Sequence, residues 1–206
     1  MKKSPYFYLA GILLGLSFSL VSLYAEERKT VLVWGDSLSS AYGMSIEKGW
    51  VSLLEKRING RGYKVINASL GGEITRGGLV RLPAMLTQHQ PDIVILELGG
   101  NDGLRGISIG EMQNNLLQMT KQAQQSGAVV LLLGMQIPPN YGPVFSQQFS
   151  KAYTTVADKT GAAFVPFFLE NVATDFDLMQ ADGIHPLAKV QPVLLNNIWP
   201  ILEGLL

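Results

Sequence analysis

The sequence predicts a single α/β domain with three layers, in which helices cover both faces of a five-stranded parallel sheet. Short apolar runs alternate with helix-length amphipathic segments along residues 26–206, and no repeat, low-complexity stretch or linker interrupts them. The chain has 206 residues, of which 47% are hydrophobic, so it can fill one substantial core. It has no cysteine, which excludes a disulfide scaffold, a thiolate metal site and a cysteine nucleophile.

Five apolar runs are the expected strands: TVLVW, YKVIN, DIVILEL, AVVLLLG and AAFVPF, at residues 30–34, 63–67, 92–98, 128–134 and 162–167. The third and fourth consist almost entirely of Val, Ile and Leu, which is typical of central parallel strands. Five helices are expected, at residues 48–58, 78–89, 108–126, 146–159 and 190–205. In the third helix, Ser108 and Glu111 have the spacing of a capping box, and apolar residues recur every three or four positions.

The first 25 residues have the pattern of a secretory signal peptide. Two lysines precede an uncharged apolar run, and Ala25 stands at the junction with a charged segment. We expect cleavage after Ala25; the alternative is an uncut signal anchor, because Leu23 is larger than the residue usual at its position. The domain at residues 26–206 is then expected to be periplasmic or secreted, with a net charge of −2, because the leader holds two of the 16 basic residues.

Residues suited to acyl transfer stand in the loops that follow the expected strands. Open parallel sheets bind ligands beyond the carboxyl ends of their strands, so these loops form the candidate site. Ser37 follows the first strand, Gly72 follows the second, and Asn101 lies on a glycine-rich turn after the third. Each residue alone is more often an ordinary turn former or helix cap, so the prediction depends on their coming together.

Asp182 and His185 near the C-terminus complete the set. The only other histidine, His89, lies in a polar stretch, whereas Asp182 can reach the His185 ring across a short turn. Ser37 would attack a carbonyl carbon, His185 would remove its proton, and Asp182 would orient the imidazole. The N–H groups of Ser37 and Gly72 and the side chain of Asn101 would bind the oxyanion.

These motifs resemble those of the SGNH (GDSL) hydrolase superfamily. GDSLS at residues 35–39, Gly72, GGND at 99–102 and DGIHP at 182–186 match its four blocks in order. The resemblance implies a flavodoxin-like strand order of 2-1-3-4-5, a Ser-His-Asp triad, a three-donor oxyanion hole, and no metal or organic cofactor. Related enzymes often have Ser-Gly-Asp where this chain has Gly-Gly-Glu at residues 71–73, so Gly71 remains an alternative to Gly72.

The segment ELGGNDGLRG at residues 97–106 resembles more narrowly the bacterial periplasmic arylesterase branch, which includes the multifunctional thioesterase I, protease I and lysophospholipase. This implies a serine hydrolase that forms an acyl-enzyme on Ser37 and cleaves carboxylic esters and thioesters, such as aryl esters, fatty acyl esters and lysophospholipids. The candidate substrate-binding residues are Leu104, Ile137, Pro138 and Tyr141.

The expected partner is a small-molecule ester. The 16 basic and 16 acidic residues balance, so the charge gives no reason to expect nucleic acid. We also expect a monomer without stable membrane insertion once the leader is cut. Two other functions remain open: a carbohydrate O-acetylesterase with the same machinery, and a non-catalytic flavodoxin-like ligand-binding module.

Overall fold

The computed structural model describes residues 28–206, so the expected signal peptide at residues 1–25 lies outside the described part of the chain. Five parallel strands form one sheet with the order β2-β1-β3-β4-β5. They are β1 (Lys29–Gly35), β2 (Tyr63–Asn67), β3 (Ile93–Glu97), β4 (Val129–Leu133) and β5 (Ala163–Val165). The predicted fold class, the strand order and all five strands are confirmed.

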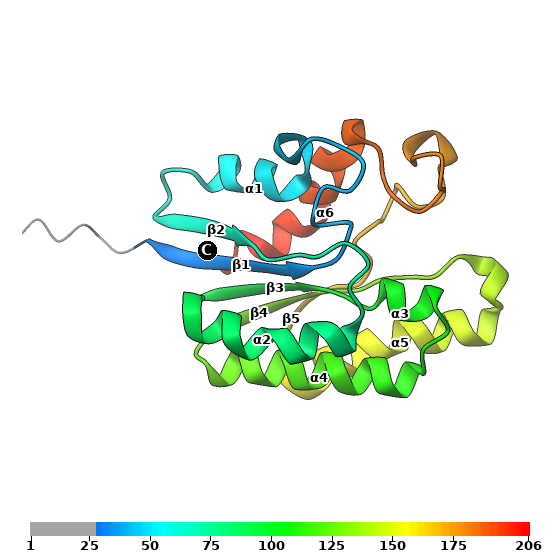
Figure 1. Ribbon diagram of the computed structural model, residues 1–206, viewed down its shortest axis with the longest axis horizontal. Helices are drawn as coiled ribbons and strands as arrows, with labels where there is room; N and C mark the ends of the chain where they lie inside the picture. The colour runs from blue at the N-terminus through cyan, green and yellow to red at the C-terminus, as the bar shows by residue number, and fades with distance from the viewer. Residues whose placement is uncertain (1–27) are drawn as a thin grey trace, which may run out of the picture.

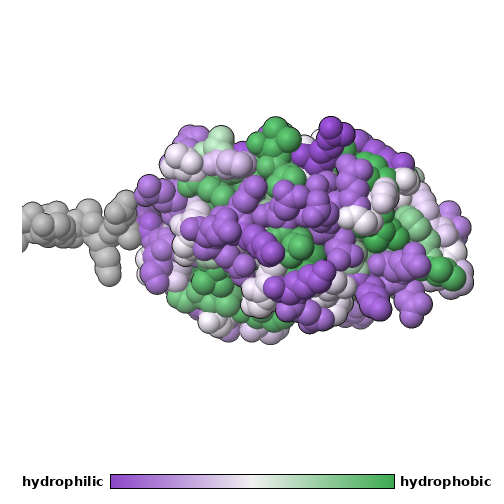
Figure 2. All heavy atoms as spheres, turned by 90° about the horizontal axis from the view of Figure 1, so that it is seen from below, coloured by the Kyte–Doolittle hydropathy of each residue, from purple (hydrophilic) through white to green (hydrophobic). Residues whose placement is uncertain are grey.

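Helices cover both faces of this sheet (Figure 1). On one face lie α1 (Trp50–Ile58) and α6 (Gln191–Leu202), and on the other lie α2 (Thr75–His89), α4 (Ile109–Gln125) and α5 (Pro143–Thr160). Each corresponds to an expected helix, with ends that differ by at most three residues. Figure 2 shows that the surface over α2, α4 and α5 is mainly hydrophilic, with apolar residues in small separate groups, so these helices turn their apolar stripes to the sheet.

Two local predictions were wrong. Asn101 does not lie on a turn, because it belongs to the short helix α3 (Gly100–Leu104), which is separated from the end of β3 by two residues. The Ser108 side chain makes no capping hydrogen bond at the start of α4, so the capping box does not form.

The loops also contain short 3-10 helices, at Ile46–Lys48, Pro139–Tyr141, Phe176–Leu178 and Ala188–Val190.

The neighbouring strands β1 and β3 form the centre of the core. The side chains of Val31–Trp34 in β1 and Ile93–Leu96 in β3 are at most 2% exposed. The chain crosses from β1 to β2 through α1 on one face and from β2 to β3 through α2 on the other. The loops that leave β1 and β3 therefore start side by side at the switch point of the sheet, where α/β folds of this type bind ligands.

Gly78 in α2 lets this helix approach the sheet closely. A Cβ atom on Gly78 would lie 2.5 Å from Leu98 Cδ1 and 3.1 Å from Trp34 Nε1. Alanine normally stabilises a helix relative to glycine, but here we expect overpacking to prevail, so that Gly78→Ala lowers the free energy of unfolding by about 1–3 kcal/mol. Urea unfolding would measure this.

The matched control is Gly110→Ala in α4, where the nearest atom to an added Cβ is Ser108 Oγ at 3.6 Å. We expect this variant to be at least as stable as the parent chain. A Gly78→Ala protein with the stability of the control would contradict the proposed close approach of α2.

Candidate active site

A cavity of about 580 Å³ opens at the carboxyl ends of the strands. The loops that follow all five strands contribute to its walls, as expected for this sheet. Four candidate residues that the sequence placed in separate loops line this cavity: Ser37, Gly72, Asn101 and His185. Among residues 28–206, no group of three His, Asp or Glu side chains is placed to hold a metal ion, and no helix is long and apolar enough to span a bilayer.

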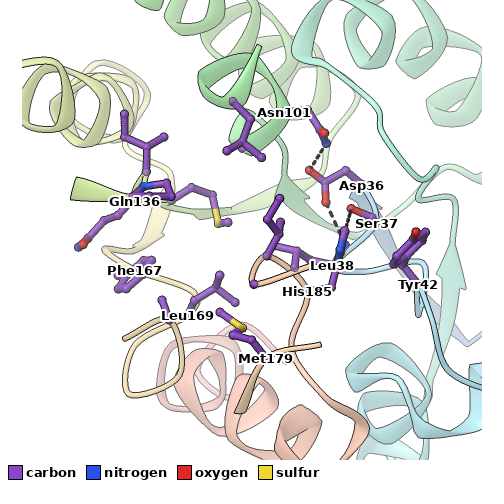
Figure 3. A pocket seen from close by; sticks show the side chains of 18 of the residues that line it. Asp36, Ser37, Leu38, Tyr42, Asn101, Gln136, Phe167, Leu169, Met179 and His185 are labelled. Atoms are coloured by element: carbon purple, nitrogen blue, oxygen red, sulfur yellow. Dashed lines mark hydrogen bonds between the residues drawn. The ribbon is translucent and has the colours of Figure 1, made fainter. Parts of the chain in front are cut away.

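Ser37, His185 and Asp182 form a hydrogen-bonded chain at this cavity. His185 Nε2 lies 2.8 Å from Ser37 Oγ, and His185 Nδ1 lies 2.7 Å from Asp182 Oδ2 (Figure 3 shows Ser37 and His185). The other Asp182 oxygen, Oδ1, accepts the backbone N–H groups of Ile184 and His185 at 2.9 and 3.0 Å. The carboxylate thus closes the turn that carries the histidine and also orients the imidazole ring.

Asp182 is ionised at neutral pH. Burial acts to raise its pKa, but the N–H groups of His185 and Ile184 and the His185 ring outweigh burial and lower the pKa to about 2. An ionised carboxylate only accepts hydrogen bonds, so Nδ1 of a neutral His185 carries the proton and donates it to Asp182. Nε2 is then left to accept the proton of Ser37, which is the arrangement that a general base needs.

Tyr42 packs its ring against the ring of His185 at the cavity. Its ring lies 4.3 Å from the His185 ring between centroids, and its backbone N–H donates to Ser37 O at 3.3 Å. Gln180 Nε2 donates to Tyr42 O at 2.9 Å, which ties the nucleophile loop to the histidine loop. No spacing or composition signal in the sequence marks Tyr42, so only the structure reveals its contact with the triad.

Asp36, which precedes the proposed nucleophile, connects Ser37 to Asn101. Its Oδ1 accepts the Leu38 N–H at 3.0 Å, and its Oδ2 accepts from Asn101 Nδ2 at 2.9 Å (Figure 3). An amide nitrogen carries two hydrogens, so Asn101 keeps one for a ligand in the cavity. Burial raises the pKa of Asp36 to about 6, although the Leu38 and Asn101 hydrogen bonds act in the opposite direction.

Both candidate glycines line the cavity beside Ser37 and Asn101. Gly72 has a left-handed backbone with φ of 74°, which a residue with a side chain rarely adopts. Its carbonyl oxygen accepts from Arg105 Nη2 at 2.9 Å, so the loop after β2 is tied to the segment after α3. Of the two glycines, only Gly72 has a backbone conformation that requires glycine, and both remain candidate oxyanion donors.

Three of the four candidate substrate-binding residues, Leu104, Ile137 and Pro138, line the cavity. Tyr141 is not among the lining residues; its hydroxyl donates to Leu104 O at 3.3 Å, so it supports the wall from behind. The sequence reasoning missed a second apolar wall in the segment from the end of β5 to the triad histidine. Its apolar lining residues are Phe167, Leu169, Ala173, Phe176, Met179 and Ile184.

Comparison with known proteins identifies the family of this chain. Residues 33–191 match the GDSL-like Lipase/Acylhydrolase family. The chain belongs to this family. The family resemblance noted in the sequence is therefore confirmed.

Relatives with described activities cover almost the whole chain. The chain is 49% identical to Esterase TesA of Pseudomonas aeruginosa, over 96% of this chain and 100% of the relative. It is 42% identical to an Arylesterase of Vibrio mimicus, over 85% and 88% of the two chains. It is 39% identical to Thioesterase 1/protease 1/lysophospholipase L1 of Escherichia coli K12, over 86% and 85%. The protein is therefore an ester-cleaving serine hydrolase of the GDSL type, and the non-catalytic binding module is excluded.

Solved structures show the same fold. The crystal structure of TesA superposes with a TM-score of 0.84 at 52% identity, covering 86% of this chain and 100% of the other. The psychrotrophic esterase EstA from Pseudoalteromonas sp. gives a TM-score of 0.81 at 40% identity, covering 85% and 97%.

The raised pKa of Asp36 makes the stability of this enzyme depend on pH. Because the folded-state pKa lies above the ordinary value of 3.8, this carboxyl stabilises the fold fully below pH 3.8, and the contribution is lost as the pH rises through about 6. Asp36→Asn removes the ionisation. We therefore expect the stability of the variant relative to the parent chain to increase between pH 4 and 7 in urea unfolding.

The same substitution turns an amide NH₂ group towards Asn101 Nδ2, so we expect kcat for ester hydrolysis to fall by about ten- to a hundredfold. Asp158→Asn on the exposed face of α5 is the control for both measurements. A relative stability of Asp36→Asn that does not change with pH would contradict the assignment of the ionisation to Asp36.

Proposed function

We propose that the protein is an exported esterase that cleaves medium- and long-chain acyl esters, aryl esters and lysophospholipids, and also thioesters, through an acyl-enzyme on Ser37. The observation that carries this proposal is the 2.8 Å contact between His185 Nε2 and Ser37 Oγ at a cavity with largely apolar walls. The expected leader at residues 1–25 supports a periplasmic location, where lysophospholipids and acyl esters are more accessible than cytoplasmic acyl-CoA.

In the proposed mechanism, Ser37 Oγ attacks the carbonyl carbon of the ester while His185 Nε2 takes the hydroxyl proton. The oxyanion of the tetrahedral intermediate is bound by the N–H groups of Ser37 and Gly72 and by Asn101 Nδ2. His185 then gives its proton to the departing alcohol oxygen, and the acyl-enzyme forms. Water attacks this intermediate with His185 again as the base, His185 returns the proton to the departing Ser37 Oγ, and the acid is released.

The cavity walls favour acyl chains longer than acetate. Leu104, Ile137 and Pro138 lie on one side, and the segment at residues 167–184 supplies further apolar side chains. Each buried methylene contributes about 0.8 kcal/mol of transfer free energy, so a longer chain gains affinity from this lining. An acetyl group is too short to use it, and the lining therefore favours acyl esters over acetylated sugars.

Replacing Ser37 with alanine tests the nucleophile. We expect Ser37→Ala to lower kcat on chromogenic esters by at least about a thousandfold, because the residual rate comes only from binding and the oxyanion donors. Its thermal unfolding should match that of the parent chain. Turnover close to the parental rate would contradict the role of Ser37.

The chain-length preference depends on the apolar wall. Phe167 lines the cavity, and in Figure 3 it lies across the cavity from Ser37. We expect Phe167→Ala to lower kcat/KM for decanoyl esters by about tenfold, because the lost ring removes apolar contact area, while butyryl esters change by less than about twofold.

Phe164→Ala, a partly buried phenylalanine of β5 that does not line the cavity, is the matched control. Equal losses on short and long esters would contradict an acyl groove along this wall. Faster cleavage of acetylated sugars than of any longer ester would favour the carbohydrate O-acetylesterase instead.

A further inference from the structure

Glu97 carries a fully buried carboxyl group next to the turn that bears the proposed nucleophile. The mechanism above gives this group no role. Glu97 is the last residue of β3 and pairs in register with Gly35, the last residue of β1. Its side chain is 0% exposed, although acidic side chains are almost never fully buried without a reason.

The Glu97 carboxyl holds the nucleophile turn on both sides of Ser37. Its Oε2 accepts the backbone N–H of Asp36 at 3.3 Å and the hydroxyl of Ser39 at 2.7 Å. Ser37 stands between these two attachment points. The same oxygen therefore anchors the residue before the nucleophile and the second residue after it.

The absence of a side chain at Gly35 leaves room for the Glu97 carboxyl group. A Cβ atom on Gly35 would lie 2.6 Å from Glu97 Oε2 and 2.8 Å from Ser39 Oγ, so a side chain at position 35 would displace the contact. Ser39 O in turn accepts from Asn67 Nδ2 at 2.8 Å, which fixes the far end of the turn to the end of β2. The exits of β1, β2 and β3 are thus joined through residues that flank Ser37.

The surroundings of Glu97 favour the uncharged form of its carboxyl group. Burial raises the pKa of Glu97 well above its ordinary value, and the neighbouring Asp36 carboxylate raises it further, while the hydrogen bonds from Ser39 and Asp36 oppose these effects. Among the described residues, its Oε1 has no hydrogen-bond partner. A buried polar atom without a partner costs free energy, so this side chain is poorly explained by stability alone.

We propose that Glu97 is a positioning residue for ester hydrolysis, which holds the turn at residues 36–39 so that the Ser37 hydroxyl faces His185 while the Ser37 N–H faces the oxyanion. The proposal rests on Ser37 being the nucleophile. A displacement of about 1 Å at a reacting group can cost on the order of a hundredfold in rate, so loss of this anchor acts on kcat.

The test compares Glu97→Ala, Glu97→Gln and Ser39→Ala in steady-state hydrolysis of a butyryl ester and in the rate at which a fluorophosphonate labels Ser37. We expect Glu97→Ala to lower kcat and the labelling rate by about ten- to a hundredfold with KM within twofold. Glutamine keeps a neutral acceptor oxygen, so Glu97→Gln should recover most of this loss. Ser39→Ala, which removes one anchor, should lower kcat by about three- to tenfold.

Gln191→Ala is the matched control, because Gln191 Oε1 is also buried and accepts a backbone N–H, that of Trp50 at 3.1 Å, but lies outside the cavity lining. It should lower thermal stability while leaving kcat within twofold. Equal losses of kcat in Gln191→Ala and Glu97→Ala at similar losses of stability would overturn the proposal.

Two further results would also overturn it: a Glu97→Gln enzyme as slow as Glu97→Ala, or a Ser39→Ala enzyme with the parental kcat. The Ser39→Ala measurement decides the matter if Glu97→Ala does not fold. An active Ser37→Ala variant would instead refute the proposed nucleophile, so the two failures are distinguishable.

Discussion

The pairing of β1 with β3 is the constraint on which the active site depends. These strands are not consecutive in the chain, yet Gly35 and Glu97 lie opposite each other at their carboxyl ends. The crossovers through α1 and α2 run on opposite faces, so no helix separates the two exits. Ser37 and Asn101 therefore meet through Asp36 although they are 64 residues apart in the sequence, and the remaining site residues are placed against this pair.

Three carboxyl groups near the nucleophile have pKa values shifted in different directions because their surroundings differ. Asp182, with a side chain 36% exposed and three hydrogen-bond donors, has its pKa lowered to about 2. Burial raises the pKa of Asp36 to about 6, and burial together with the Asp36 charge raises that of Glu97 well above its ordinary value. Two adjacent buried carboxyl groups repel each other when both are charged, and most of this repulsion energy is removed when one of them is neutral. The hydrogen bonds from Leu38 and Asn101 lower the pKa of Asp36, so they favour the charge on the residue that orients the Asn101 amide.

The sequence was most informative where the chemistry requires a particular residue type. The five strands follow from their apolar runs, and Ser37, Asp182 and His185 follow from the need for a nucleophile, a base and an orienting carboxylate. Helix α3 is too short to show a helical period, so its sequence reads as a turn. Glu97 was hidden because it stands inside an apolar run, and periodicity carries no information about what a buried carboxyl contacts. Tyr42 and the wall at residues 167–184 depend on tertiary packing between irregular segments, for which no sequence pattern exists.

That wall has a consequence for how substrate binding affects the reaction, because the segment that lines the cavity also carries the triad residues. Met179 pairs with Pro186 in an isolated bridge, and Gln180 N–H donates to His185 O at 2.7 Å. The apolar wall and the turn of Asp182 and His185 are thus parts of one hydrogen-bonded unit. An acyl chain bound in the cavity as proposed would pack against the same unit that carries Asp182 and His185. Contacts that the acyl chain makes far from the ester bond can then help to hold His185 in its reactive position. The binding energy of these contacts would thereby raise the reaction rate as well as the affinity.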